Sequence, residues 1–102
     1  FVKGDALVGF SVDGHAGAGA EGSDIVCAAV SSAAYMTANT ITEICRCPAE
    51  AEATEGHMRV MVAQGDAPRC QAILRGFRLH MEGLKEQYPR YIHMETVDIS
   101  EV

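Results

Sequence analysis

The sequence predicts an α+β domain, a two-layer sandwich in which two helices pack on one face of a mixed, mostly antiparallel sheet. Two observations lead to this prediction: segments with strand patterns come in pairs, and a long segment with helical spacing follows each pair. The expected order is strand, strand, helix, strand, strand, helix, strand, for which two helices on one sheet face is the simplest packing. No repeat or linker interrupts the 102 residues, so residues 1–102 are expected to form a single domain.

Two strands are expected before the first helix. The first covers residues 1–3 and turns at Gly4-Asp5. The second covers residues 8–12, where apolar residues alternate with small or polar ones in the pattern of a half-buried strand. His15 follows directly where this strand ends.

A glycine-rich stretch separates His15 from the first helix. Residues 16–23 contain no bulky apolar side chain, so we expect this stretch to be mobile. Its glycines do not fit a nucleotide-binding fingerprint, and a flexible lid is the better interpretation. The expected lid glycines are Gly17, Gly19 and Gly22.

The first helix is predicted to begin at Ser23 or Asp24, because a short side-chain oxygen satisfies the free N–H groups of a first turn. Apolar residues then cover much of the helix circumference as far as Ile44, which favours packing on more than one side. The helix is expected to end near Cys45, because Pro48 disfavours a helical conformation in the residue before it.

The second half of the chain repeats the arrangement. Residues 49–53 form a weak strand pattern and residues 58–62 a clearer one. Asp66 is expected to cap a second helix that has a proline in its first turn. The apolar face of that helix is expected to hold Cys70, Leu74, Phe77, Met81, Leu84 and Tyr88. Pro89 ends the helix, and residues 91–97 are predicted to be the last strand.

Charge and composition exclude several classes of function. A net charge of −6 argues against nucleic acid as a partner, because phosphate binding needs a clustered basic face, and it favours a basic protein partner. No apolar run is expected to approach the roughly 20 residues that span a bilayer, and no signal peptide is visible. The four cysteines are interpreted as reduced thiols. We therefore expect a cytoplasmic protein without a membrane partner.

Cys27 and His15 are the candidate catalytic residues. They lie at the two ends of the glycine-rich stretch, and Cys27 opens a long apolar helical run. A nucleophilic cysteine has to ionise, and both a helix N-terminus and a neighbouring histidine favour the thiolate. Without this arrangement, Cys27 would be interpreted as a small core residue and His15 as an exposed loop histidine. The pattern indicates a cysteine hydrolase.

The same residues resemble a known family. Gly14-His15-Ala16, followed by Gly-Ser-Asp-Ile-Val-Cys-Ala-Ala-Val-Ser over residues 22–31, is similar to the signature of the ribosomal-processing cysteine proteases (Prp). Those small bacterial enzymes remove an N-terminal extension from one large-subunit ribosomal protein. The resemblance implies a homodimer, and a substrate with bulky apolar residues just before the cut and basic residues beyond it.

The resemblance also implies roles within the site. Cys27 would attack the scissile carbonyl, and His15 would take the thiol proton and protonate the departing amine. The N–H groups near Cys27 and Ala28 are expected to stabilise the oxyanion. Asp24, acidic as in the family, either caps the helix or orients His15. Ser31, one turn after Cys27, is expected to support the thiol region.

No metal or cofactor is expected. Cys45-Arg46-Cys47 lacks both the zinc-ligand spacing and the Cys-x-x-Cys spacing of redox proteins, and His57, His80 and His93 show no ligand pattern. Two other functions stay open at this point. One is a module that binds a ribosomal-protein tail without cutting it, and the other is a thiol redox protein that uses Cys27 or the Cys45/Cys47 pair.

Overall fold

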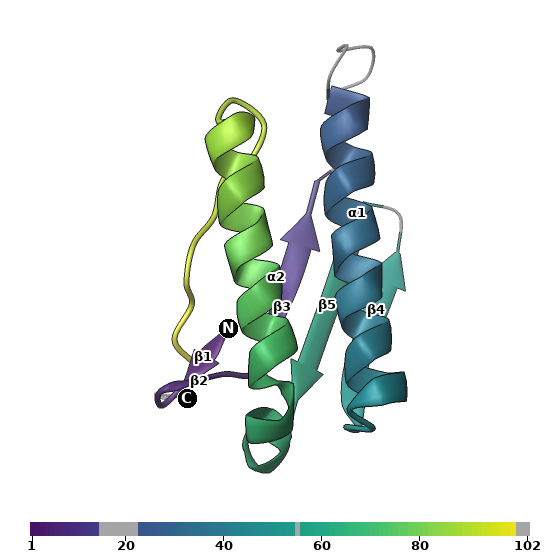
Figure 1. The fold of residues 1–102 in the computed structure, drawn as a ribbon, viewed down its shortest axis with the longest axis vertical. Coiled ribbons are helices and arrows are strands. Elements are labelled where there is room, and N and C mark those ends of the chain that lie inside the picture. Colours follow the sequence, from purple (N-terminus) through teal and green to yellow (C-terminus); the bar gives the residue numbers. More distant parts are fainter. Residues whose placement is uncertain (15–22, 55, 100–102) are drawn as a thin grey trace.

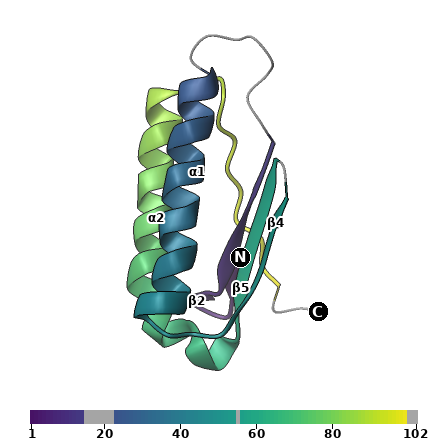
Figure 2. The same cartoon turned by 90° about the vertical axis from the view of Figure 1, so that its right-hand side faces the viewer.

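The computed structural model describes residues 1–14, 23–54 and 56–99. Two long helices lie side by side in one layer, and a three-stranded antiparallel sheet forms the other, as Figure 2 shows. A separate two-stranded hairpin lies at the end of this sandwich where the N-terminus is found (Figure 1). The predicted α+β class, with both helices on one face of the sheet, is confirmed.

The three-stranded sheet has the order β3–β5–β4. Its strands are Gly9–Asp13 (β3), His57–Val62 (β5) and Ala49–Thr54 (β4). In the register of β3 and β5, Phe10 lies opposite Val60, and both side chains are buried. β4 alternates alanine with glutamate along an outer edge of the sheet and is largely exposed. Charged side chains on such an edge disfavour pairing with another chain.

The early hairpin consists of Val2–Lys3 (β1) and Ala6–Leu7 (β2). Gly4 has a φ of 63° at the turn, a left-handed conformation that glycine adopts without steric cost. The predicted turn at Gly4-Asp5 is therefore confirmed. The backbone N–H of Val8 donates to the carbonyl of Phe1 at 2.9 Å, which fixes the hairpin against the start of β3.

The first helix, Ser23–Asn39 (α1), continues into a π-helical turn, Thr40–Ile44 (η1). The N–H of Cys45 donates to the carbonyl of Thr40 at 2.8 Å, which is the five-residue spacing of a π-helix. The Thr40 hydroxyl in turn donates to the carbonyl of Met36 at 2.8 Å, and such back-bonding often bends a helix. The predicted end near Cys45 is confirmed, and the π-helical turn was not predicted.

One side of α1 and η1 packs into the core, where Val26, Ala34 and Thr37 of α1 and Ile41 of η1 are buried. The helical segment Ile25–Ile44 has a mean hydropathy of 1.2, so by length and composition alone it is apolar enough to cross a membrane. The expectation that no apolar run approaches that length was wrong. The core side explains part of this apolar character, but several large apolar side chains remain exposed. They are Ile25 (63% exposed), Tyr35 (53%), Met36 (53%) and Ile44 (76%).

The second helix, Ala67–Gln87 (α2), follows a short 3-10 turn, Gln64–Asp66 (η2). Its predicted apolar face is confirmed: Cys70, Leu74, Phe77 and Met81 are buried, and Leu84 and Tyr88 are half-buried. Asp66 occupies the cap position, but its side chain makes no capping hydrogen bond. Its carboxylate instead accepts from Arg69 Nη2 at 2.6 Å, because the guanidinium lies within reach one turn along.

The core lies between the two layers. Phe10 of β3 meets Phe77 of α2 with ring centroids 4.4 Å apart and planes inclined by 36°. Offset aromatic pairs of this kind add to the free energy gained from burial alone. This contact places α2 over β3 and so fixes two walls of the cavity described below.

The prediction of a last strand over residues 91–97 was wrong. The segment runs back along α2 without regular structure (Figure 1). An isolated parallel bridge joins Val2 to Asp98, flanked by bonds from Val2 N–H to the Val97 carbonyl and from Ile99 N–H to the Val2 carbonyl, each 2.9 Å. Because β1 is only two residues long, it offers no edge along which a full strand could pair.

Candidate active site

Cys27 lies at the start of α1, four residues after the helix begins at Ser23. Its neighbour Val26 is buried in the core, so the helix rotates Cys27 toward the boundary between core and solvent. The thiol is free and half-buried. This combination of access and partial burial suits a nucleophile better than a core residue.

A cavity of about 890 Å³ opens beside Cys27. It lies between β3, α1, α2 and the segment 91–97, and Cys27 and Val30 contribute to its α1 wall. The apolar part of its lining includes Phe10, Val12, Val30, Phe77 and Met81, and the charged part consists of Asp13, Arg78, Glu82, Lys85, His93 and Glu95. A cavity lined by both apolar and charged side chains can receive side chains of a bound peptide.

Ser31 lines the same cavity as Cys27. The two residues are four apart on one α-helix, so their side chains lie on the same helical face. The prediction that Ser31 shares the face of Cys27 is therefore confirmed. Its supporting role toward the thiol stays a prediction.

The end of β3 is held in place by its neighbour β5. Gly14 has a φ of 107°, and its N–H donates to the carbonyl of Gly56 at 2.8 Å. The Asp13 carboxylate pairs with His57 Nδ1 across the two strands, and Asp13 also lines the cavity. Residue 14 directly precedes His15 in the sequence, so the point from which the chain reaches His15 is fixed. The end of β3 and the first turn of α1 lie at the same end of the molecule (Figures 1 and 2).

The pairing of His57 with Asp13 was missed by the sequence analysis. The two residues are 44 positions apart, and only the register of β3 and β5 brings them together. The strand alternation that begins at Met58 carried a partial signal, because it placed His57 directly before a predicted strand and beside a turn.

Several predicted site residues lie outside the described part of the chain. They are His15 and the glycines 17, 19 and 22 of the expected lid. Asp24 belongs to α1, but its side chain also lies outside the described residues. The Cys-His dyad, the lid and the role of Asp24 therefore stay predictions.

The N–H groups near Cys27 and Ala28 were expected to stabilise the oxyanion. Both residues belong to α1, which begins at Ser23. Their role toward the oxyanion stays a prediction.

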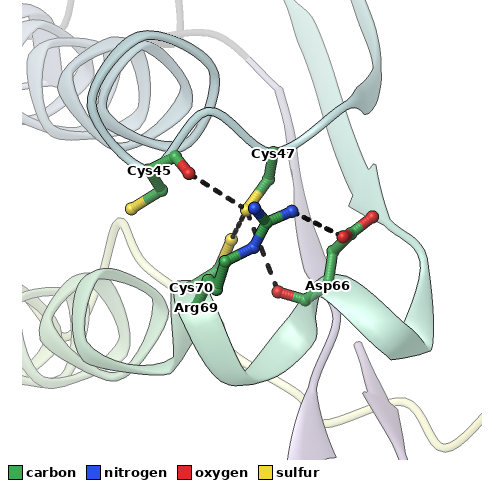
Figure 3. Close-up of polar contacts among 5 residues, drawn as sticks. All are labelled: Cys45, Cys47, Asp66, Arg69 and Cys70. Carbon is green, nitrogen blue, oxygen red and sulfur yellow. Dashed lines mark hydrogen bonds and ion pairs between the residues drawn. The ribbon is translucent and has the colours of Figure 1, made fainter.

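The other cysteines gather far from Cys27, at the opposite end of the helices (Figures 1 and 3). Cys70 is fully buried in the core, as predicted, and Cys47 is 2% exposed. Burial and the neighbouring Cys47 thiol raise the pKa of Cys70 to about 12. Among residues 1–14, 23–54 and 56–99, no group of three or more His, Cys, Asp or Glu side chains is placed to hold a metal ion.

Comparison with known proteins gives one matching family model. The model described as cysteine protease Prp matches residues 1–93. A comparison with curated proteins gives no significant match.

Solved structures share the fold. The structure of an essential ribosomal processing protease Prp from S. aureus with a substrate peptide has a TM-score of 0.80, 23% identity, and coverage of 88% of this chain and 87% of that one. The same enzyme with a covalently linked product peptide has a TM-score of 0.76 and 24% identity, with coverage of 87% of this chain and 86% of that one. SMU.848 from Streptococcus mutans has a TM-score of 0.76 and 24% identity, with coverage of 94% of this chain and 88% of that one.

Proposed function

The chain belongs to the cysteine protease Prp family, and we propose that it is an endopeptidase that removes an N-terminal extension from a ribosomal protein. The observation that carries the proposal is the position of Cys27, a half-buried free thiol in the wall of a cavity of about 890 Å³. The ribosomal substrate is supported by the S. aureus protein of the same fold, which is a ribosomal processing protease. Such a substrate puts the enzyme in the cytoplasm, where ribosomes assemble.

In the proposed reaction, Cys27 Sγ attacks the scissile carbonyl after its proton passes to His15. The peptide C–N bond breaks as His15 returns that proton to the departing amine, which leaves a thioester on Cys27. His15 then takes a proton from water, the resulting hydroxide attacks the thioester, and the thiol is restored. We assign Asp24 to orienting His15, and Ser31, on the cavity wall next to Cys27, to supporting the thiol. We assign stabilisation of the oxyanion to backbone N–H groups at the start of α1.

The cavity supports the proposed substrate chemistry. Its apolar lining, with Phe10, Phe77 and Met81, suits bulky apolar side chains before the cut. The same lining carries three acidic groups, Asp13, Glu82 and Glu95, against the two basic groups Arg78 and Lys85, and the chain carries a net charge of −6. A basic segment beyond the cut would be attracted to such a surface.

We also propose that the enzyme is a homodimer and that α1 provides the contact. Ile25, Ala28, Ser32 and Tyr35 recur at steps of three and four residues, so they share one exposed face of α1. Large apolar side chains on this face are more than half exposed, and such patches commonly mark interaction sites.

The function is tested with a peptide that spans the junction between the extension and the mature ribosomal protein. Wild type should cut it at one bond. Cys27→Ala should bind the peptide, as measured by fluorescence anisotropy, without cutting it. Cys45→Ala, which removes another partly exposed thiol that does not line the cavity, is the matched control and should cut normally.

The rival functions give different results in the same experiment. A tail-binding module would bind the peptide with all three proteins and cut it with none. A redox protein would consume thiols during incubation with the peptide and release no fragment. Cutting by Cys27→Ala at the wild-type rate would place the nucleophile elsewhere and end the proposal.

The dimer is tested by light scattering of two single variants. Met36→Glu puts a charge on the exposed apolar face of α1 and should convert a dimer into a monomer. Leu79→Glu changes a more exposed apolar residue of α2 (71% exposed) and is the control that should stay dimeric. A wild-type monomer at micromolar concentration would contradict the assignment.

A further inference from the structure

Two buried thiols face each other at the end of the helices remote from Cys27. Cys47 lies in the link between η1 and β4, and Cys70 lies in the first turns of α2. They are 2% and 0% exposed. The Cys70 thiol donates to Cys47 Sγ with the two sulfur atoms 3.0 Å apart (Figure 3). None of the proposed catalytic steps uses either residue.

The sulfur atoms are close to bonding distance. A disulfide bond is about 2.05 Å long, so a movement of about 1 Å would join the atoms, which are 3.0 Å apart in the thiol state. The side chain of Cys45 points away from the pair in Figure 3. The redox alternative in the sequence analysis named the pair Cys45/Cys47, whereas the fold brings Cys47 next to Cys70.

The surroundings hold the Cys47 sulfur in position and make the two thiols unequal. Cys47 Sγ lies 3.7 Å from the carbonyl oxygen of Cys45 and 3.8 Å from that of Asp66, so two backbone acceptors surround its S–H group. The pKa of Cys70 is raised by burial and by Cys47, which keeps Cys70 protonated. The positive charge of Arg69 opposes that rise and lies on the same helix turn. Of the two residues, Cys47 is therefore the one we expect to react first with an oxidant.

We propose that Cys47 and Cys70 are a modification site, a thiol pair that hydroperoxides convert into an intramolecular disulfide. In the first step Cys47–SH reacts with hydrogen peroxide, the O–O bond breaks, and Cys47 sulfenic acid and one water form. In the second step the Cys70 sulfur attacks the sulfenic sulfur, its proton leaves with the hydroxyl group as a second water, and the S–S bond forms. The two sulfur atoms together lose two electrons, and the peroxide gains them.

The bond would tie two segments that are 23 residues apart in sequence. It would join the base of α1 and η1 to the base of α2, with the β4–β5 hairpin inside the closed loop. A cross-link of this length restricts the unfolded chain, and for a domain of this size we expect an increase in Tm of about 10 °C. The site does not depend on the proposed protease activity.

The test starts from the Cys27→Ala variant, so that oxidation of the half-buried Cys27 thiol does not add to the signal. After exposure to hydrogen peroxide, mass spectrometry should show the loss of two hydrogen atoms. A peptide map without reductant should show a cross-link between Cys47 and Cys70, and calorimetry should show the higher Tm. Dithiothreitol should reverse all three changes.

Two further variants in this background separate the pair from its neighbours. Cys45→Ser keeps both facing sulfurs and should form the cross-link as before. Cys47→Ser removes one of them and should show neither the cross-link nor the rise in Tm. A Cys45–Cys47 link, a sulfinic acid on Cys47 without any cross-link, or a cross-linked protein with unchanged Tm would each overturn the proposal.

Discussion

Replacing Gly9 by alanine should destabilise the protein, because β5 leaves no room for a side chain at this position. A Cβ atom on Gly9 would lie 2.1 Å from the carbonyl oxygen of Val60 and 2.8 Å from Met61 Sδ. The thioether of a methionine can move aside, but the carbonyl of Val60 is part of the strand backbone. Relief of that contact requires β3 to shift away from β5 by about 1 Å.

The expected loss in the free energy of unfolding has two contributions. Overpacking of this kind costs about 1–3 kcal/mol, and each strand hydrogen bond weakened by the shift costs about 1 kcal/mol. We therefore expect Gly9→Ala to lower the free energy of unfolding by about 3 kcal/mol, out of the roughly 5–15 kcal/mol typical of a domain.

The same chemical change in α2 provides the matched control. Gly76 is an exposed helix residue around which a Cβ would find nothing within 4 Å. Alanine is a better helix former than glycine, so Gly76→Ala should raise the free energy of unfolding by about 1 kcal/mol.

Both variants are measured by urea unfolding followed by far-UV circular dichroism, with the midpoint compared at constant m. A Gly9→Ala protein within about 0.5 kcal/mol of wild type would refute the close approach of β3 to β5.

Three further predictions concern the core, a helix end and a buried thiol. Phe77→Ala should lower the free energy of unfolding by about 3–5 kcal/mol, and a double-mutant cycle with Phe10→Ala in urea should show coupling of about 1 kcal/mol from the ring contact. Arg46 follows η1 with a φ of 55°, a left-handed conformation that favours glycine. Arg46→Gly should therefore raise the free energy of unfolding by up to about 1 kcal/mol, and Tm with it, whereas Arg46→Ala should not. Because the pKa of Cys70 is about 12 in the folded state, the native protein keeps a proton that the unfolded chain loses from about pH 8.5 upward. The contribution of this group to the free energy of unfolding is complete below that pH. It should fall by up to about 1.4 kcal/mol per pH unit as the pH rises toward 12. Cys70→Ala should lack this slope when urea unfolding is measured at each pH.

Local patterns were enough to predict most of the elements. The alternation at Val8, Phe10 and Val12 marks β3, and the spacing from Cys70 to Met81 marks the buried face of α2. Residues 91–97 have strand propensity without a strand, because a strand also needs an unpaired edge beside it, and β1 is only two residues long. Propensity alone cannot report whether such an edge exists.

The candidate site could be predicted only in part, because sequence patterns report contacts within one element and not contacts between distant elements. Cys27 and Ser31 are neighbours on one helix, so their spacing alone places them on one wall of the cavity. The pairs Asp13–His57 and Cys47–Cys70 depend on strand register and on the packing of α2. Contacts between residues 44 and 23 positions apart in sequence have no local signature.

The attachment of segment 91–97 to Val2 has a consequence for how the enzyme is made. One wall of the cavity beside Cys27 comes from this segment, and its far end is held by backbone bonds to Val2, a residue synthesised near the beginning of the described chain. During translation the α1 wall and Cys27 leave the ribosome first, while the closing wall is still being polymerised. A nascent protease therefore carries its thiol on an open surface and completes the cavity only when its two distant segments join.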